Sequence, residues 1–162
     1  MPISGSEFRN ALSRFASGVS VVTTHDASGL PHGITVSSFC SVSLVPPLVL
    51  ICIEKTTASH DSFGQSGVFV VNVLSGSQQR LSERFAEPSE DKFTDVDFEN
   101  GLFNVPVLKD ALANIECRLT HAYDGGDHTI FVGSVEQVTV RGDDPLVYFE
   151  GDYTRLAKTR NG

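Results

Sequence analysis

The sequence predicts a mainly β protein, a β-barrel or sandwich flanked by a few short helices. Short runs rich in Val, Ile, Thr and Phe recur along the chain, separated by Gly, Pro, Asp and Ser, which is the pattern of strands joined by turns. Stretches with helical periodicity are few and short. Because the chain has no internal repeats, low-complexity tracts or linkers, one curved sheet or two packed sheets is the architecture that fits.

Length and charge limit the organisation and the partners. With 162 residues, the chain is expected to form a single domain over 1–162, since it is long enough for a core and short for two. The net charge of −8 and the lack of a basic run argue against nucleic acid and against an anionic membrane surface. No apolar run approaches the roughly 20 residues of a membrane helix. The first ten residues lack the basic and apolar regions of a secretion signal, so a cytoplasmic protein is expected.

Cysteine and histidine spacing predicts neither disulfides nor a metal site. Cys40, Cys52 and Cys117 lie far apart in apolar, strand-like contexts without CxxC spacing. An odd number of scattered cysteines favours buried, reduced thiols. The histidines show no HxxxH or paired-Cys spacing, so no metal is predicted.

An N-terminal helix is the first element. Ser4 and Glu7 form a capping box, and Gly18 is placed to end the helix. Apolar residues follow at the spacing of one helical face: Phe8, Ala11, Leu12 and Phe15. This pattern predicts an amphipathic helix packed on the sheet.

The remaining elements alternate between strands and short helices. Strands are predicted at 19–25, from 30 onward, and at 48–53, 68–74, 115–123, 129–140 and 146–149. Helices are predicted at 57–65 and from Ser75 or Ser77 to just before Pro88. The DGGD sequence predicts a hairpin turn. The acidic, aromatic stretch 89–107 lacks periodicity, and a loop of that length is expected to cover a site or an interface.

The alternation from 34 to 44 is the most informative pattern. The even positions are nearly all apolar, and the odd positions are four hydroxyls and one aromatic: Thr35, Ser37, Phe39, Ser41 and Ser43. A period of two places these sets on opposite faces of a strand. Since 32–53 contains no Lys, Arg, Asp or Glu, the hydroxyl face suits a flat, polar ligand. A plain solvated or interface-facing strand is the alternative.

The segment after the buried strand is a candidate phosphate site. Lys55, Thr56, Thr57 and Ser59 immediately precede or begin a predicted helix. Free backbone N–H groups, the positive helix end, a lysine and hydroxyls together would cradle a phosphate. The P-loop pattern is absent, and a capped helix start with a solvent-exposed lysine is the alternative. With the hydroxyl strand, the segment indicates a site for a flat ring with a phosphate tail.

Gly126-Asp127-His128 places a histidine at the first position of a strand. There the imidazole can face a ligand at the rim of a sheet, although such a histidine is more often a polar residue beside a turn. Tyr148 and Tyr153 could stack on a ring, but packing is the commoner role of such tyrosines. A serine hydrolase is weakly supported, because no GxSxG sequence occurs.

Six segments, in order and over nearly the whole chain, resemble the short-chain flavin reductase family, the reductase components of two-component flavin monooxygenases. They are FRNALSRFASGVSVVTT, HGITVSSFCSVSLVPPLVLICI, SGVFVVNVLSGSQQRLSERFA, ANIECRL, GDHTIFVGSVEQV and PLVYFEGDYTRL. The TVSSF-type and GDH-type segments make the match specific. The resemblance implies an FMN-binding split β-barrel, Greek-key-like and usually homodimeric, with FMN or FAD bound near the dimer interface.

The resemblance also assigns roles to individual residues. It places Thr35, Val36, Ser37 and Ser38 along the flavin ring. It assigns the ribityl and phosphate groups to a second set, namely Cys52, Glu54, Lys55, Thr57 and Ser59. Phe85 and Ala86 match a segment that borders the flavin, and Tyr153 matches a C-terminal aromatic close to the site. His128 is implied as the catalytic residue, near the nicotinamide.

The implied activity is that of an NAD(P)H:flavin oxidoreductase, which transfers a hydride to FMN or FAD and supplies reduced flavin to an oxygenase. Two alternatives remain: a flavin-binding carrier or sensor, and an oxidase with tightly held flavin. Because no GxGxxG fingerprint occurs, the usual discriminator between NADH and NADPH is missing. The sequence also leaves FMN and FAD equally open.

Overall fold

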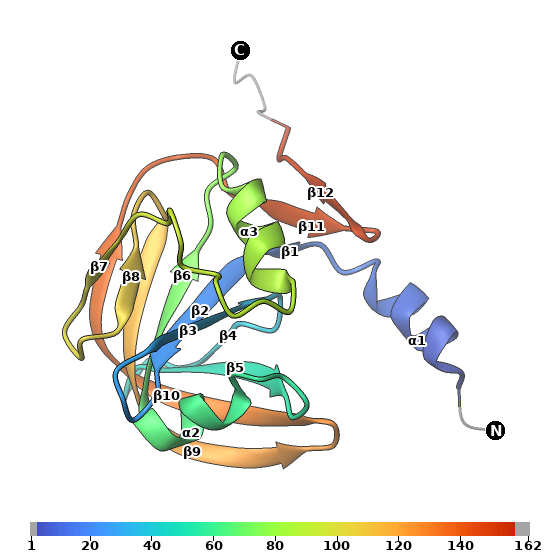
Figure 1. Cartoon of the computed structure of the whole chain (residues 1–162). Coiled ribbons are helices and arrows are strands. Elements are labelled where there is room, and N and C mark those ends of the chain that lie inside the picture. The colour runs from blue at the N-terminus through green and yellow to red at the C-terminus, as the bar shows by residue number, and fades with distance from the viewer. Residues whose placement is uncertain (1–2, 158–162) are drawn as a thin grey trace.

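The structure is a computed structural model that describes residues 3–157. Its body is one antiparallel sheet of seven strands, curled into an incomplete barrel (Figure 1). The strands are β2 (Ser20–His25), β3 (Pro31–Val36), β4 (Cys40–Ser43), β5 (Leu48–Glu54), β6 (Val68–Val73), β9 (Ala113–Gly125) and β10 (His128–Val140). Their order is β3-β2-β6-β9-β10-β5-β4. The mainly β, split-barrel prediction is therefore confirmed.

The split lies between β3 and β4, which follow each other in sequence but form the two free edges of the sheet. Only Ser37, Ser38 and Phe39 connect them, and four residue steps span at most about 14 Å. The two edges must therefore approach each other, and we call this gap the seam. The expectation of one alternating strand over 34–44 is wrong, because the chain leaves one edge at Val36 and joins the other at Cys40.

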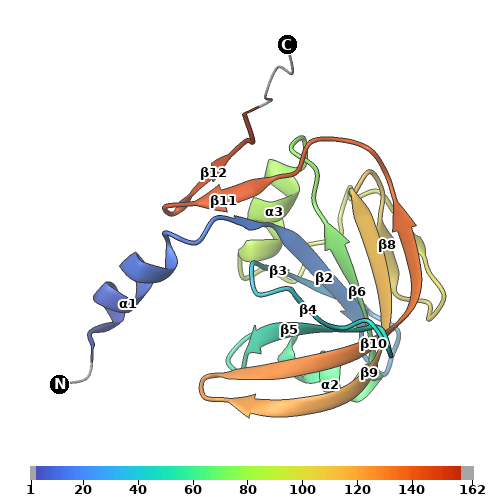
Figure 2. The same ribbon diagram turned by 180° about the vertical axis from the view of Figure 1, so that it is seen from behind.

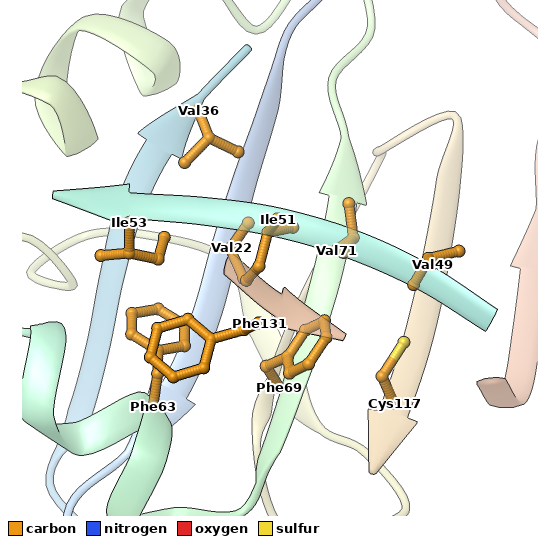
Figure 3. Close-up of a cluster of buried hydrophobic side chains, with 10 residues drawn as sticks. All are labelled: Val22, Val36, Val49, Ile51, Ile53, Phe63, Phe69, Val71, Cys117 and Phe131. Carbon is orange, nitrogen blue, oxygen red and sulfur yellow. The ribbon is translucent and has the colours of Figure 1, made fainter. Parts of the chain in front are cut away.

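The barrel interior holds the main hydrophobic cluster (Figure 3). The helix α2 (His60–Ser66) contributes Phe63, which is fully buried with Phe69 of β6. Gly133 of β10 allows this packing, since a Cβ there would lie 2.6 Å from the Phe69 ring. The barrel core is thus filled by aromatic and β-branched side chains at close contact.

The helix α3 (Gln79–Ala86) covers the outer side of β3 and β2 and creates a second cluster. Phe85 is fully buried there, and its ring lies over Gly33, where a Cβ would be 2.6 Å from it. The stretch 89–107 contains a small hairpin that the sequence did not predict, formed by β7 (Phe98–Asn100) and β8 (Pro106–Leu108). Buried hydrogen bonds hold it: Asn72 accepts from the Leu108 N–H at 2.9 Å and from the Asn114 amide at 2.8 Å.

The N-terminal arm projects from the barrel (Figure 2). Its helix α1 (Gly5–Leu12) begins at the predicted capping box, in which the Glu7 N–H donates to Ser4 Oγ at 3.2 Å. The helix ends before β1 (Ser17–Gly18), which pairs with β11 (Val147–Phe149), and β11 pairs with β12 (Asp152–Thr154). No residue of α1 is buried. The prediction that this helix packs on the sheet is wrong, because the single chain places no surface against it.

Other expectations need smaller corrections. The helix α2 begins at His60, and α3 begins at Gln79 without a side-chain cap from Ser75 or Ser77. The three cysteines are free, but Cys40 is exposed, Cys52 is half-buried and only Cys117 is buried. Burial raises the pKa of the Cys117 thiol to about 12.

Residues 3–157 contain neither a membrane-spanning helix nor a cluster of metal-binding side chains. No helix there is long and apolar enough to cross a membrane. Nor do three or more His, Cys, Asp or Glu side chains in that range gather as a metal site.

Candidate functional site

A pocket of about 260 Å³ opens at the seam, between the end of β3, the end of β5 and the start of β10. Its lining consists of Ile34, Thr35, Val36, Ser37, Ser38, Cys52, Ile53, Glu54, Thr57 and His128. The structure therefore gathers residues from three separate predicted segments in one place. The predicted site residues that it leaves outside this lining are Lys55, Thr56, Ser59, Phe85, Ala86 and Tyr153.

On the β3 side of the pocket, unpaired backbone groups rather than side-chain hydroxyls are available to a ligand. Thr35 Oγ1 donates to the Ser82 carbonyl at 2.6 Å, so this side chain faces α3. As an edge strand, β3 has backbone N–H and C=O groups that no neighbouring strand pairs. These groups can hydrogen-bond the polar edge of a flat ligand. The predicted hydroxyl face is thus replaced here by a backbone edge.

The two serines of the seam differ in what they do. Ser38 Oγ accepts from the Cys52 N–H at 3.0 Å and donates to the Cys52 carbonyl at 3.1 Å, so it holds the crossing chain against β5. Ser37 is exposed, and its hydroxyl has no hydrogen-bond partner within residues 3–157. Ser37 is therefore the serine that is free to bind a ligand.

The opposite wall pairs an acid with a histidine. In the ladder between β5 and β10, Glu54 lies directly across from His128. His128 Nδ1 is 2.7 Å from the Asp127 carboxylate, and this hydrogen bond lowers the pKa of Asp127. Since Nδ1 is engaged and the imidazole is 41% exposed, Nε2 is the ring nitrogen free to meet a ligand.

Lys55 turns away from the pocket. Its ammonium donates to the Asp124 carboxylate and, at 2.6 Å, to the Gly126 carbonyl. This interaction lowers the pKa of Asp124 and ties the turn after β5 to the tip of the β9–β10 hairpin. The role of Lys55 at a phosphate stays a prediction, and the structure gives its ammonium other partners.

Ser59 is a better candidate than Lys55 for binding a ligand. It is buried, and its hydroxyl is the buried side-chain oxygen for which residues 3–157 provide no hydrogen-bond partner. Leaving a buried hydroxyl unpaired costs free energy, and a ligand oxygen would remove that cost. However, Thr56 donates to Glu54 instead, so the four predicted phosphate groups do not converge.

The other three predicted residues lie behind β3. Phe85 packs edge-on against Phe93 at a ring distance of 5.0 Å, and Ala86 is exposed at the end of α3. The Tyr153 hydroxyl lies 2.8 Å from Ser82 Oγ. These residues support the β3 wall from the α3 side and do not line the pocket.

Two lining residues and two supporting residues were missed. Ile34 and Ile53 line the pocket, but their strand positions gave them the appearance of core residues. Asp127 acts through His128, and its presence in Gly126-Asp127-His128 was the available signal. Ser82, which bonds both Thr35 and Tyr153, carries no sequence signal.

The pocket fits the ring portion of a flavin. Its volume of about 260 Å³ is just below the roughly 300–1,000 Å³ typical for whole small ligands, so it suits a ring system whose tail continues outside. The edge of β3, the free Ser37 hydroxyl and the orphan Ser59 hydroxyl match an uncharged, hydrogen-bonding ring and a polar tail. The residues present are therefore compatible with FMN or FAD.

Comparisons with known proteins agree with this geometry. Residues 12–157 match the flavin reductase like domain. The chain is 40% identical, over 92% of its length and 76% of the other protein, to the reductase subunit HsaB of a flavin-dependent monooxygenase from Rhodococcus jostii. It is 44% identical, over 93% and 86%, to the FMN reductase (NADH) SmoA from Agrobacterium fabrum.

A solved structure gives the same result. The NADH:FAD oxidoreductase SgcE6 from Streptomyces globisporus C-1027, in complex with NAD and FAD fragments, superposes with a TM-score of 0.91 at 36% identity, over 96% of this chain and 94% of that one. The match covers the barrel and its seam. The chain therefore belongs to the flavin reductase family and is an oxidoreductase.

Proposed function

We propose that this protein works in the cytoplasm, reduces FMN or FAD with NADH, and passes the reduced flavin to a separate oxygenase. The pocket at the seam carries the proposal, because it combines a free backbone edge with a histidine at its rim. Similar proteins are named NADH-dependent reductases and monooxygenase reductase subunits.

The protein's part in the reaction is orientation. When bound, the flavin supplies the hydride-accepting ring. The β3 edge and Ser37 would hold that ring, and His128 Nε2 would orient the nicotinamide above it. Fixing two reactants in contact can contribute about 7–11 kcal/mol to lowering a barrier. No proton relay is required of the side chains.

The role of His128 can be tested by His128→Ala. We expect flavin reduction at saturating NADH to slow by about 10²-fold, the effect of misplacing a reactant, while flavin affinity changes little. Stopped-flow measurement of flavin absorbance gives the rate, and His121→Ala, another imidazole on the hairpin, is the control. A wild-type rate in His128→Ala would show that His128 has no part in the reaction.

The first assay of the whole proposal is NADH and NADPH oxidation with FMN, FAD or no flavin. Oxidation that saturates with added flavin, and is faster with NADH, supports a reductase that treats flavin as a substrate. A protein that binds flavin but oxidises neither nucleotide would be a carrier or sensor. Tightly held flavin with slow NADH reaction would indicate an oxidase.

A homodimer is part of this proposal. Phe8, Leu12 and Phe15 are 51%, 56% and 77% exposed on the arm. The arm is nevertheless held in place, because Arg14 pairs with Glu150 and the Glu150 N–H donates to the Ser13 carbonyl at 2.9 Å. Apolar side chains on a fixed, projecting helix indicate a surface that another molecule covers. We propose that a second copy of this chain covers it.

A further inference from the structure

The pocket wall formed by β5 and β10 carries a carboxylate without a counter-charge. Glu54 lines the pocket across from His128. Within residues 3–157, the hydrogen bond to its carboxylate comes from the uncharged Thr56 hydroxyl, at 2.7 Å. None of the lining residues is Lys or Arg. Glu54 therefore brings a negative charge that its surroundings do not neutralise.

The cations near the seam are held by other groups. Lys55 donates to Asp124 and to the hairpin backbone. On the α3 side, Lys92 donates to the Gly33 carbonyl at 3.3 Å and the Phe85 carbonyl at 2.9 Å. A positive charge on His128 would be paired with Asp127 at 2.7 Å. Within residues 3–157, Glu54 is therefore the carboxylate of the pocket lining that has no positively charged partner.

Hydride transfer would change the charge of a flavin bound in the pocket that Glu54 lines. The hydride leaves nicotinamide C4, which becomes a pyridinium, and bonds to flavin N5. The two electrons leave a negative charge on the N1–C2=O side of a ring that was neutral before. Glu54 is exposed in the free protein, and a bound ring would displace water from between the two charges, which strengthens the repulsion between like charges. The oxidised and reduced rings therefore meet Glu54 with different energies.

We propose that Glu54 discriminates between the two redox states, weakening the binding of reduced flavin relative to oxidised flavin and so favouring release of the product. The inference rests on the proposed flavin site. It assigns Glu54 a task in product release rather than in hydride transfer. A group that repels reduced flavin suits a protein that must release this product to another enzyme.

The test compares Glu54→Gln with wild type by equilibrium binding in both states. Flavin fluorescence gives the affinity for oxidised FMN and FAD, and anaerobic ultrafiltration gives it for the reduced forms. We expect Glu54→Gln to tighten reduced flavin about tenfold more than oxidised flavin. A tenfold change in this ratio raises the two-electron potential of bound flavin by about 30 mV. The difference should shrink as salt screens the charge.

Two further variants make the test specific. Glu54→Asp keeps the charge and should keep the wild-type ratio. Glu136→Gln removes an exposed carboxylate of β10 outside the pocket and should change neither affinity. Equal tightening or equal loss in both redox states would overturn the inference while leaving flavin binding intact. If wild-type protein bound no flavin in either state, the proposed function itself would fail.

Discussion

The barrel and the N-terminal arm use the same kinds of side chain in opposite ways. Phe63 and Phe69 are fully buried inside the barrel, whereas Phe8 and Phe15 of the arm are 51% and 77% exposed. The barrel completes its own core within one chain, and the arm does not. Periodicity therefore identified the apolar side chains of both regions, but it did not predict which of them other parts of the same chain would bury.

The largest expected effect comes from the barrel. Phe69→Ala would leave a cavity facing Gly133 and should lower the free energy of unfolding by about 3–5 kcal/mol. Urea denaturation measures the change. The matched control is Phe15→Ala in dilute protein, which should stay within about 0.5 kcal/mol of wild type. Similar losses in the two variants would break the comparison between barrel and arm.

The second prediction concerns the arm. Leu12→Asp combined with Phe15→Asp places two charges on its exposed apolar face. We expect the homodimer to dissociate with a loss of at least about 2 kcal/mol, the effect of removing a central interface anchor. Sedimentation velocity over a range of concentrations measures it, and the unfolding of the barrel core serves as the control. A wild-type protein that is monomeric at every concentration would refute the dimer.

The third prediction concerns the β11–β12 hairpin, which pairs with β1 of the arm and contacts α3. Tyr153→Phe removes the hydroxyl that bonds Ser82 Oγ at 2.8 Å and should cost about 1 kcal/mol of unfolding free energy. Ser82 is fully buried, so its own hydroxyl would lose a partner. Tyr148→Phe, which alters a tyrosine of the same hairpin, is the control. An unchanged stability would mean that the hairpin and α3 are not coupled.

The smallest effect is expected at the start of α1. Ser4→Ala removes the cap that accepts from the Glu7 N–H and should cost the helix about 0.5–1 kcal/mol. Amide hydrogen exchange in 5–12 should become a few-fold faster, and exchange in β6 should be unchanged. Faster exchange in both regions would show that the arm is part of the cooperative unit of the barrel.

The candidate site was predicted unevenly. Val36, Ser37 and His128 line the pocket as expected, because a strand end and a rim position can be read from local sequence. Thr35 was assigned by its hydroxyl, yet that hydroxyl bonds α3. Lys55 was assigned by its charge, yet that charge is held by the hairpin. In both cases the partner comes from a segment far away in the chain, which no local pattern reports.

The sequence by itself determined most strands of the barrel, the β9–β10 turn and the α1 cap, because side-chain alternation, turn residues and capping are properties of neighbouring residues. Tertiary structure decided that Val36 and Cys40 belong to opposite edges of one sheet, and so created the pocket between them. It also decided that the α1 face stays uncovered. Both outcomes depend on how the whole sheet curls, which is set by packing between residues distant in sequence.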